Sequence, residues 1–303
     1  MIKKTILFSR PARLSTQLNQ LKIEFKDQIE QRSIPIEDIG MVIMEHPQLS
    51  YTQSVLSSLA ENNCAVVFIG RNFYPSGILL PFDNHQTETE HFRYQIEASE
   101  PLKKQLWQQT VVAKIKNQAH MLEFNGLDGT ALKQKAKKVL SGDSSFEEAK
   151  AAKRYWLELF RNESFKRERW GDNPNHALNY GYAILRAAVA RAIAGSGLLP
   201  ALGIFHRNKY NSFCLADDIM EPYRPVVDHI VYTHHQKVGW SEELNTQEKA
   251  ILLKLLVTDV QFSNQTSPLS IGLSRTTASL VRCFKGTGKK LIYPSLCDSM
   301  RTE

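Results

Sequence analysis

The sequence predicts an α+β protein, with a small β-rich N-terminal domain followed by a larger all-α C-terminal domain. Two observations predict this order: up to about residue 95 apolar side chains alternate in two-residue steps, and beyond it they recur at helical spacing. The chain has 303 residues, of which 42% are hydrophobic, and this length suits one large or two moderate domains. We place the domains at residues 1–82 and 101–303, with a linker over residues 83–100.

The N-terminal domain is predicted from short strands around one helix. In residues 21–25 apolar Leu, Ile and Phe alternate with charged side chains, which is typical of a half-buried strand. Residues 64–70 are continuously apolar, which favours a central strand. Residues 52–61 carry apolar side chains on one side and predict a helix. Further strand patterns lie at residues 4–8, 33–36 and 40–44.

The second domain is predicted from helical periodicity. The proline- and glycine-containing residues 75–81 indicate the exit from the first domain, and the polar residues 83–90 begin the linker. From residue 102 to residue 119 the apolar side chains form one amphipathic stripe. Helices are also expected from residues 143–145 to Phe160 and over residues 177–194, 198–205, 212–235, 246–256 and 267–284.

Composition suggests a polyanionic partner and a reducing compartment. The chain has 38 Lys and Arg against 31 Asp and Glu, a net charge of +7. This favours nucleic acid, although many basic proteins bind none. Its four cysteines form no CxxC pair, and residues 1–5 lead into a strand pattern and not into a signal peptide. No apolar stretch approaches the roughly 20 residues of a membrane helix. We therefore expect a cytoplasmic protein without a membrane partner.

Three stretches of the second domain each offer a ligand for a hard divalent metal. They contain Glu148, His206 and an acidic run that ends at Glu221. Each of the first two has a structural alternative. Glu148 follows Ser145 at the spacing of a capping box, so its carboxylate could serve only the helix start. His206 follows an apolar segment and, taken alone, fits a surface or capping residue.

The acidic run is less easily explained as ordinary surface. On a helix, Asp217 and Asp218 both share a face with Glu221, and such like charges repel one another. Pro222 and Pro225 each remove one helical hydrogen bond and free the carbonyls of Asp218 and Glu221. A bound cation would offset this cost. An internal salt-bridge network is an equal alternative.

Basic side chains cluster around these acids, mainly over residues 150–169. Such a run of basic residues usually forms a solvated helix face. Next to a metal site, however, it suits the phosphates of a nucleic acid. On charge and position alone, the candidates for DNA contact are Arg154, Lys166, Arg169 and Arg207.

Several ordered motifs carry a resemblance to a known family. The motifs are LW at 106–107, KIKNQ at 114–118, EAKAAKRYW at 148–156, NHALNYGYAIL at 175–185, LGIFH at 202–206 and FCLADDIMEPYRPVVD at 213–228. With these motifs the chain resembles CRISPR-associated protein one, the integrase that inserts spacers during CRISPR adaptation, over essentially its whole length. The sequence at residues 220–225 resembles the versions that accompany type II systems.

The resemblance implies a metal site and a set of partners. The ligands would be Glu148, His206 and Glu221, with Asp217 and Asp218 as possible additional acids, and the metal would be Mg²⁺ or Mn²⁺. The resemblance also implies a homodimer formed through the β-rich domain. Two such dimers would clamp a dimer of the smaller CRISPR-associated protein two in a heterohexamer. The substrates would be double-stranded DNA, the protospacer and the CRISPR repeat, and other type II CRISPR proteins are candidate partners.

The expected function is that of a metal-dependent DNA integrase and endonuclease that inserts spacers by 3′-hydroxyl strand transfer. Because the nucleophile would belong to the DNA, the protein needs no catalytic Ser or Cys. The alternative is a non-catalytic DNA-binding scaffold of the adaptation complex. A metal-dependent phosphatase or nuclease acting on small substrates is a third hypothesis.

Overall fold

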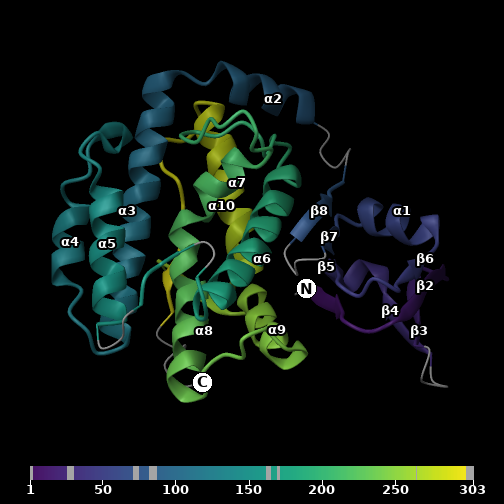
Figure 1. Cartoon of the computed structure of the whole chain (residues 1–303). Helices are drawn as coiled ribbons and strands as arrows, with labels where there is room; N and C mark the ends of the chain where they lie inside the picture. The colour runs from purple at the N-terminus through teal and green to yellow at the C-terminus, as the bar shows by residue number, and fades with distance from the viewer. Residues whose placement is uncertain are drawn as a thin grey trace. The chain divides into compact units, whose positions relative to one another are not determined.

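The chain folds into two compact units, Met1–Glu88 and Thr89–Glu303, seen in a computed structural model (Figure 1). The structure describes residues 3–25, 31–70, 75–81, 87–161, 165–168, 171–263 and 265–297. In these ranges no helix has the length and apolar character needed to cross a membrane.

The first unit contains two four-stranded sheets. One has the order β1-β5-β7-β8, in which β7 pairs parallel with β5 and antiparallel with the edge strand β8. The other has the order β4-β3-β2-β6. The element bounds are β1 Lys4–Phe8, β2 Ala12–Gln17, β3 Gln20–Phe25, β4 Arg32–Pro35, η1 Ile36–Asp38, β5 Ile39–Met44, β6 Ser50–Tyr51, α1 Gln53–Glu61, β7 Ala65–Ile69 and β8 Pro75–Leu79.

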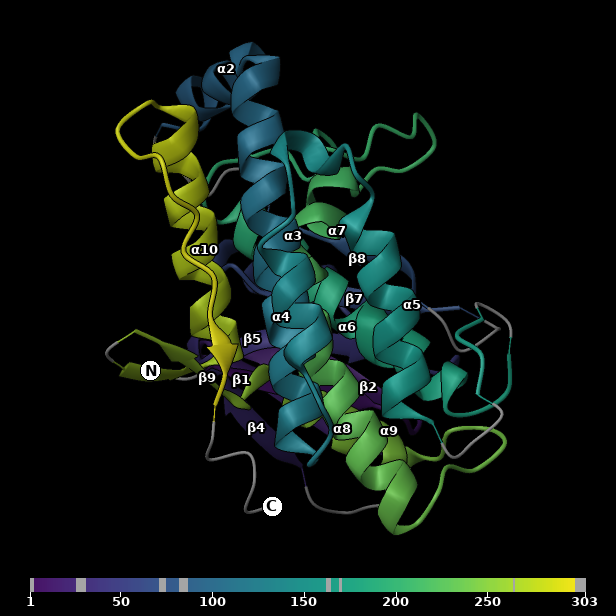
Figure 2. The same ribbon diagram turned by 90° about the vertical axis from the view of Figure 1, so that its left-hand side faces the viewer.

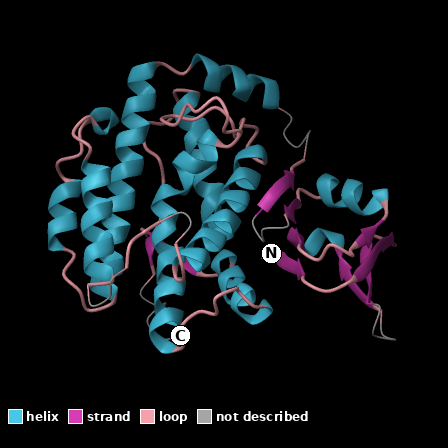
Figure 3. Ribbon diagram, viewed as in Figure 1, coloured by secondary structure: helices cyan, strands magenta, loops and turns pink. Residues whose placement is uncertain are grey.

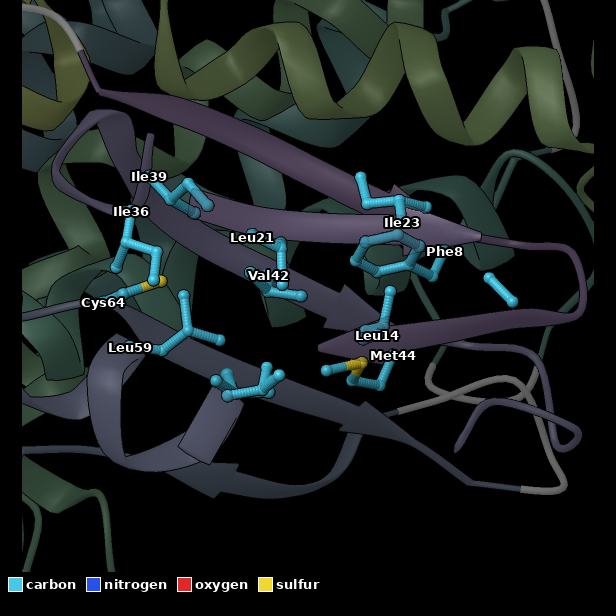
Figure 4. Close-up of a cluster of buried hydrophobic side chains, with 13 residues drawn as sticks. Phe8, Leu14, Leu21, Ile23, Ile36, Ile39, Val42, Met44, Leu59 and Cys64 are labelled. Carbon is cyan, nitrogen blue, oxygen red and sulfur yellow. The ribbon is translucent and has the colours of Figure 1, made fainter. Parts of the chain in front are cut away.

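Apolar side chains from both sheets and from α1 form the core of this unit. Figure 4 shows Leu14 and Leu21 of one sheet close to Val42 of the other, with Leu59 of α1 nearby. All four are completely buried. The predicted strands and helix of this domain, and the interior position of residues 65–69, are therefore confirmed.

The second unit is mostly helical. Figure 3 shows its helices in cyan, with a few short strands in magenta. Their bounds are α2 Glu88–Glu97, α3 Glu100–Phe124, α4 Thr130–Ala136, η2 Ser141–Asp143, α5 Glu147–Leu159, α6 Asn175–Ala194, α7 Cys214–Met220, η3 Glu221–Tyr223, α8 Arg224–Lys237, α9 Thr246–Leu253, η4 Lys254–Leu256, β9 Asp259–Phe262, β10 Gln265–Pro268, α10 Leu269–Phe284 and β11 Ser295–Leu296.

Helix α3 is the central element of this unit. It begins where the Ser99 side chain accepts a hydrogen bond from the Leu102 N–H, with a proline in the first turn. Buried residues then occur on more than one side of it, because α4, α5 and α8 all pack against it (Figures 1 and 2). The single amphipathic stripe predicted for this segment is therefore too narrow a description.

Four predictions need correction. The second unit is not all-α, because β9, β10 and β11 form a three-stranded antiparallel sheet. Residues 198–205 are irregular and not helical. Residues 75–79 form the edge strand β8, where a proline at the first position is tolerated. Within the expected linker, Glu88–Glu97 forms α2, whose Gln95 side chain donates to the carbonyls of Leu199 and Leu202.

Candidate metal centre

A lysine joins two of the predicted metal ligands. The Lys114 ammonium, on α3, lies 2.6 Å from Oε1 of Glu148 on α5 and 2.6 Å from Oε2 of Glu221 in η3. The Lys114 side chain is 11% exposed, Glu221 7% and Glu148 23%. Burial alone would lower the pKa of Lys114, but Glu221 and Glu148 together outweigh it and raise that pKa. The lysine therefore stays charged between the two acids.

Glu221 has a second cationic partner. Nε of Arg224 lies 2.8 Å from its Oε1. Burial alone would raise the pKa of Glu221, but Arg224 and Lys114 hold it below its usual range. Near Arg224, Asp217 pairs with Arg186 at 2.7 Å and accepts from Asn211. Internal salt bridges, which were one alternative for the acidic run, are thus present at both Glu221 and Asp217.

The two prolines interrupt the α-helical hydrogen bonds as predicted, but the carbonyls of Asp218 and Glu221 are not left without partners. The Asp218 carbonyl accepts from the Glu221 N–H and the Glu221 carbonyl from the Arg224 N–H, each three residues ahead. This is the bonding of a 3₁₀ turn. The Pro222 carbonyl accepts a 2.7 Å hydrogen bond from the Asn117 side chain of α3. Helix α3 therefore anchors both the side chain of Glu221, through Lys114, and the backbone beside it.

Glu148 does not serve as a helix cap. The carboxylate of Asp143 accepts from the N–H groups of Glu147 and Glu148, at 2.9 and 3.0 Å. The hydroxyl of Ser145 has no hydrogen-bond partner among the described residues. The capping-box alternative for Glu148 is therefore wrong, and its carboxylate is directed to Lys114. Asp143 supplies the first-turn acceptor instead.

The loop that carries His206 is organised by Asp218. This carboxylate is completely buried and accepts from the N–H groups of residues 204, 205 and 206 and from Nδ1 of His206, the last at 2.6 Å. The hydrogen bond to Asp218 raises the pKa of His206. Because Nδ1 is engaged, Nε2 is the ring nitrogen left for a ligand. Asp218 is thus a positioning group for His206 and is too fully occupied to act as the additional metal ligand.

Close packing fixes the same loop. A side chain on Gly203 would place its Cβ 2.4 Å from the His206 carbonyl oxygen and 2.7 Å from Oδ2 of Asp218, so only glycine fits. Phe205 stacks on Trp107 of α3 with ring centroids 4.2 Å apart, and the His206 ring meets Trp107 edge-on at 5.7 Å. The imidazole is 44% exposed, so it is held in place while remaining accessible.

In the described ranges, no three His, Cys, Asp or Glu side chains lie close enough together to hold a metal ion. The structure brings Glu148 and Glu221 onto one ammonium and keeps His206 close enough for its charge to lower the pKa of Glu221. Oε2 of Glu221 is buried and lies 2.6 Å from the Lys114 ammonium, its cationic partner. Two carboxylates that converge on one cation, beside an oriented imidazole, fit a divalent metal once Lys114 withdraws.

The candidate DNA-contacting residues lie on exposed surface where they are described. Arg154 pairs with Glu158 one turn ahead, and Arg207 pairs with Glu100. Their side chains remain 54% and 60% exposed, and Lys166 is also exposed. Arg169 lies outside the described residues. Burial fixes none of the three described positions, so the sequence candidates stand on charge alone.

In the sequence Lys114 was noted only as part of a motif, and its place in the site was not predicted. A signal was present: Lys114 lies on the helix face of Trp107, Val111 and Gln118, all of them buried. A lysine on such a face requires a buried anionic partner.

With this geometry in view, the chain can be compared with known proteins. The family described as CRISPR associated protein Cas1 matches residues 5–256. The CRISPR-associated endonuclease Cas1 of Neisseria meningitidis is 39% identical over 269 residues, which cover 88% of this chain and 86% of the relative. The chain belongs to the Cas1 family. A second relative, CRISPR-associated endonuclease Cas1 2 of Pyrobaculum aerophilum, is 26% identical and covers 91% of this chain and 97% of its own length.

Solved structures show that the Cas1 fold is shared along the chain. A casposase bound to integration product superposes with a TM-score of 0.80 at 19% identity, covering 96% of this chain and 93% of that one. A Cas1 protein from Thermotoga maritima gives 0.74 at 18% identity, covering 95% and 99%. A Cas6-RT-Cas1–Cas2 complex gives 0.75 at 19%, covering 96% of this chain and 36% of that chain. At these identities the likeness establishes fold.

Proposed function

We propose that this Cas1 protein is a metal-dependent DNA endonuclease and integrase that inserts spacers into a CRISPR array by 3′-hydroxyl strand transfer. The observation that carries the proposal is the convergence of Glu148 and Glu221 on a single cation, 2.6 Å from each, beside a loop that orients His206. The endonuclease names of the Neisseria and Pyrobaculum relatives support the reaction class.

Glu148, His206 and Glu221 would hold Mg²⁺ or Mn²⁺, the carboxylates through oxygen and the imidazole through Nε2. When bound, such a metal polarises the scissile phosphodiester and stabilises the charge that develops on it. Asp218 fixes the orientation of the imidazole, and Arg224 holds one oxygen of Glu221 so that the other faces the site. Because the attacking hydroxyl belongs to the DNA, the chain needs only to align the two reactants.

The DNA substrates would be the protospacer and the CRISPR repeat. Arg154, Lys166, Arg169 and Arg207 would neutralise phosphates, which gives a contribution that depends on salt and little on sequence. The likeness to a casposase bound to integration product supports an integration reaction.

The working assembly would contain more than this chain. The Cas6-RT-Cas1–Cas2 complex supports a Cas2 partner, and we propose a heterohexamer in which two homodimers, formed through the β-rich unit, hold a Cas2 dimer. The sequence of residues 220–225 favours a type II-like subtype. Other type II CRISPR proteins would then be further partners. We place this work in the cytoplasm, where the array lies.

An assay of strand transfer in the presence of Cas2 tests the proposal. A 3′-hydroxyl-ended duplex and a repeat-containing target are incubated with Mn²⁺ or Mg²⁺, and branched product is counted. Glu148→Gln, Glu221→Gln and His206→Ala should each lose activity by at least about a hundredfold while retaining duplex binding. Glu158→Gln, the same change on the outer part of α5, is the matched control and should remain active.

Two results would contradict the proposal. Full activity of a ligand variant would remove that residue from the reaction. Wild-type protein that binds DNA but makes no product with either metal would support the scaffold alternative instead.

A further inference from the structure

The position of Lys114 bears on how a metal could enter the site. Its ammonium faces Oε1 of Glu148 and Oε2 of Glu221 at the same distance, 2.6 Å. The other oxygen of Glu221, Oε1, is taken by Arg224 at 2.8 Å. A metal that engages Glu221 must therefore approach Oε2, the oxygen that Lys114 now contacts. Metal and ammonium compete for that atom.

The charges show why a cation is needed there at all. Glu148 and Glu221 carry two negative charges, and Lys114 and Arg224 carry two positive ones. Without Lys114, two carboxylates would face each other in a largely buried space, and like charges at such a separation repel strongly. An ordinary buried ion pair would use one acid. Here one lysine serves two acids that come from different elements.

We propose that Lys114 is an internal placeholder cation that keeps Glu148 and Glu221 together in the metal-free protein and is displaced when a divalent metal binds. This inference rests on the proposed metal site. It predicts that Lys114 weakens metal binding, because part of the binding free energy is spent on breaking its two ion pairs. A purely structural lysine would stabilise the fold without opposing the metal.

The test compares lysine variants by direct metal binding, with no reaction involved. Lys114→Met keeps the length of the side chain and removes its charge, whereas Lys114→Arg keeps the charge. Lys135→Met is the matched control, because Lys135 lies 3.7 Å from Glu147, the neighbour of Glu148, and outside the site. Mn²⁺ binding to each full-length protein is measured by calorimetry and by Mn²⁺ electron paramagnetic resonance. Thermal unfolding is recorded with EDTA and with Mn²⁺.

If Lys114 is a placeholder, Lys114→Met binds Mn²⁺ about tenfold more tightly or better, since a unit charge opposing the ion has gone. Its unfolding midpoint should fall in EDTA, and the rise that Mn²⁺ produces should exceed that of wild type. Lys114→Arg and Lys135→Met should bind Mn²⁺ like wild type. Should Lys114→Met fail to fold without metal, it is purified with Mn²⁺, and Lys114→Gln gives a second uncharged side chain for the same comparison.

Equal or weaker Mn²⁺ binding by both uncharged variants would overturn the placeholder role. A failure of the proposed function looks different. In that case Glu221→Gln would bind Mn²⁺ as well as wild type does, or wild type would bind none. The two failures are therefore separable in one set of titrations.

Discussion

Two acidic clusters lie along α5 and the continuous η3–α8 segment, and different groups balance their charge. Near the start of α5 and in η3, Glu148 and Glu221 face cations, Lys114 and Arg224. Two turns further on, Tyr155 of α5 and Asp228 of α8 form the second cluster.

In the second cluster, neutral hydroxyls replace the cations. Asp228 is 2% exposed and accepts from Tyr155 at 2.9 Å and from Tyr182. Burial raises the pKa of Asp228 to about 6. In the first cluster two cations hold the pKa of Glu221 below its usual range, whereas in the second the pKa of the buried acid is raised. Only the first is equipped to exchange one cation for another.

Arg224 joins the clusters, and its removal should have the largest effect. It pairs with Glu221 and lies over the Tyr182 ring at 4.6 Å from the centroid. Arg224→Met leaves a buried carboxylate with one cation fewer, so we expect unfolding to become easier by about 4 kcal/mol. Urea unfolding measures this loss. A loss of under about 1 kcal/mol would mean that the clusters are independent of this residue.

The pH dependence of stability should distinguish the second cluster. The pKa of Asp228 is raised in the folded protein, so the folded state binds its proton more tightly than the unfolded chain does. Its contribution is therefore present at low pH and is lost as pH rises from about 4 to about 6. Across that window Asp228→Asn should gain roughly 3 kcal/mol relative to wild type. A wild-type–variant difference that stays constant between pH 4 and pH 6.5 in urea titrations would contradict this.

Gly203→Ala tests how far the proposed metal site depends on the loop that carries His206. The added methyl would overlap the His206 carbonyl and Asp218, so the loop must shift at a cost of about 2 kcal/mol, with weaker metal binding. Gly77→Ala is the control, because the nearest atom to its Cβ would be 3.9 Å away. Thermal unfolding and Mn²⁺ titration report the two effects. A normal metal affinity in Gly203→Ala would separate the loop from the site.

The smallest effect is expected at the exposed end of α5. Arg154 is 54% exposed and pairs with Glu158, so Arg154→Met should change stability by at most about 0.5 kcal/mol. If Arg154 contacts DNA, the same variant should weaken duplex binding and flatten its salt dependence, with a slope reduced by about 1. Unchanged duplex binding over a salt series would mean that Arg154 does not contact DNA.

Local patterns predicted the fold better than they predicted the contacts of the site. Two-residue alternation predicted β3, and continuous apolar character predicted β7. Burial of one or both faces of a strand determines which of its positions are apolar, so it can be predicted from the local sequence. Strand β8 was missed because its proline and glycine match a turn, and only pairing with β7 makes it a strand. In the short sheet of β9, β10 and β11, strand β11 pairs with β9 from a distant segment of the sequence, and no local period predicts such a pairing.

The features of the site also divide into local ones, which the sequence predicted, and tertiary ones, which it did not. The prolines after Glu221 predicted the break in α-helical hydrogen bonding, since the lost bonds are a local property, but not the 3₁₀ turn that replaces them. The Asp143 cap, the lysine between the two acids and the four donors on Asp218 were not predicted, because each depends on tertiary packing. The spacing of Ser145 and Glu148 favoured a capping box that packing against α3 overrules.

The hydrogen bond from Asn117 to the Pro222 carbonyl has a consequence for protein engineering. Asn117 also donates to the Pro294 carbonyl, so one amide on α3 ties together the turn of Glu221 and the approach to β11. Transplanting the three presumptive ligands alone into another scaffold would leave behind the helix that sets their spacing. A chimera should instead exchange α3 as an intact block, with its tryptophan, lysine and asparagine moving as one cassette.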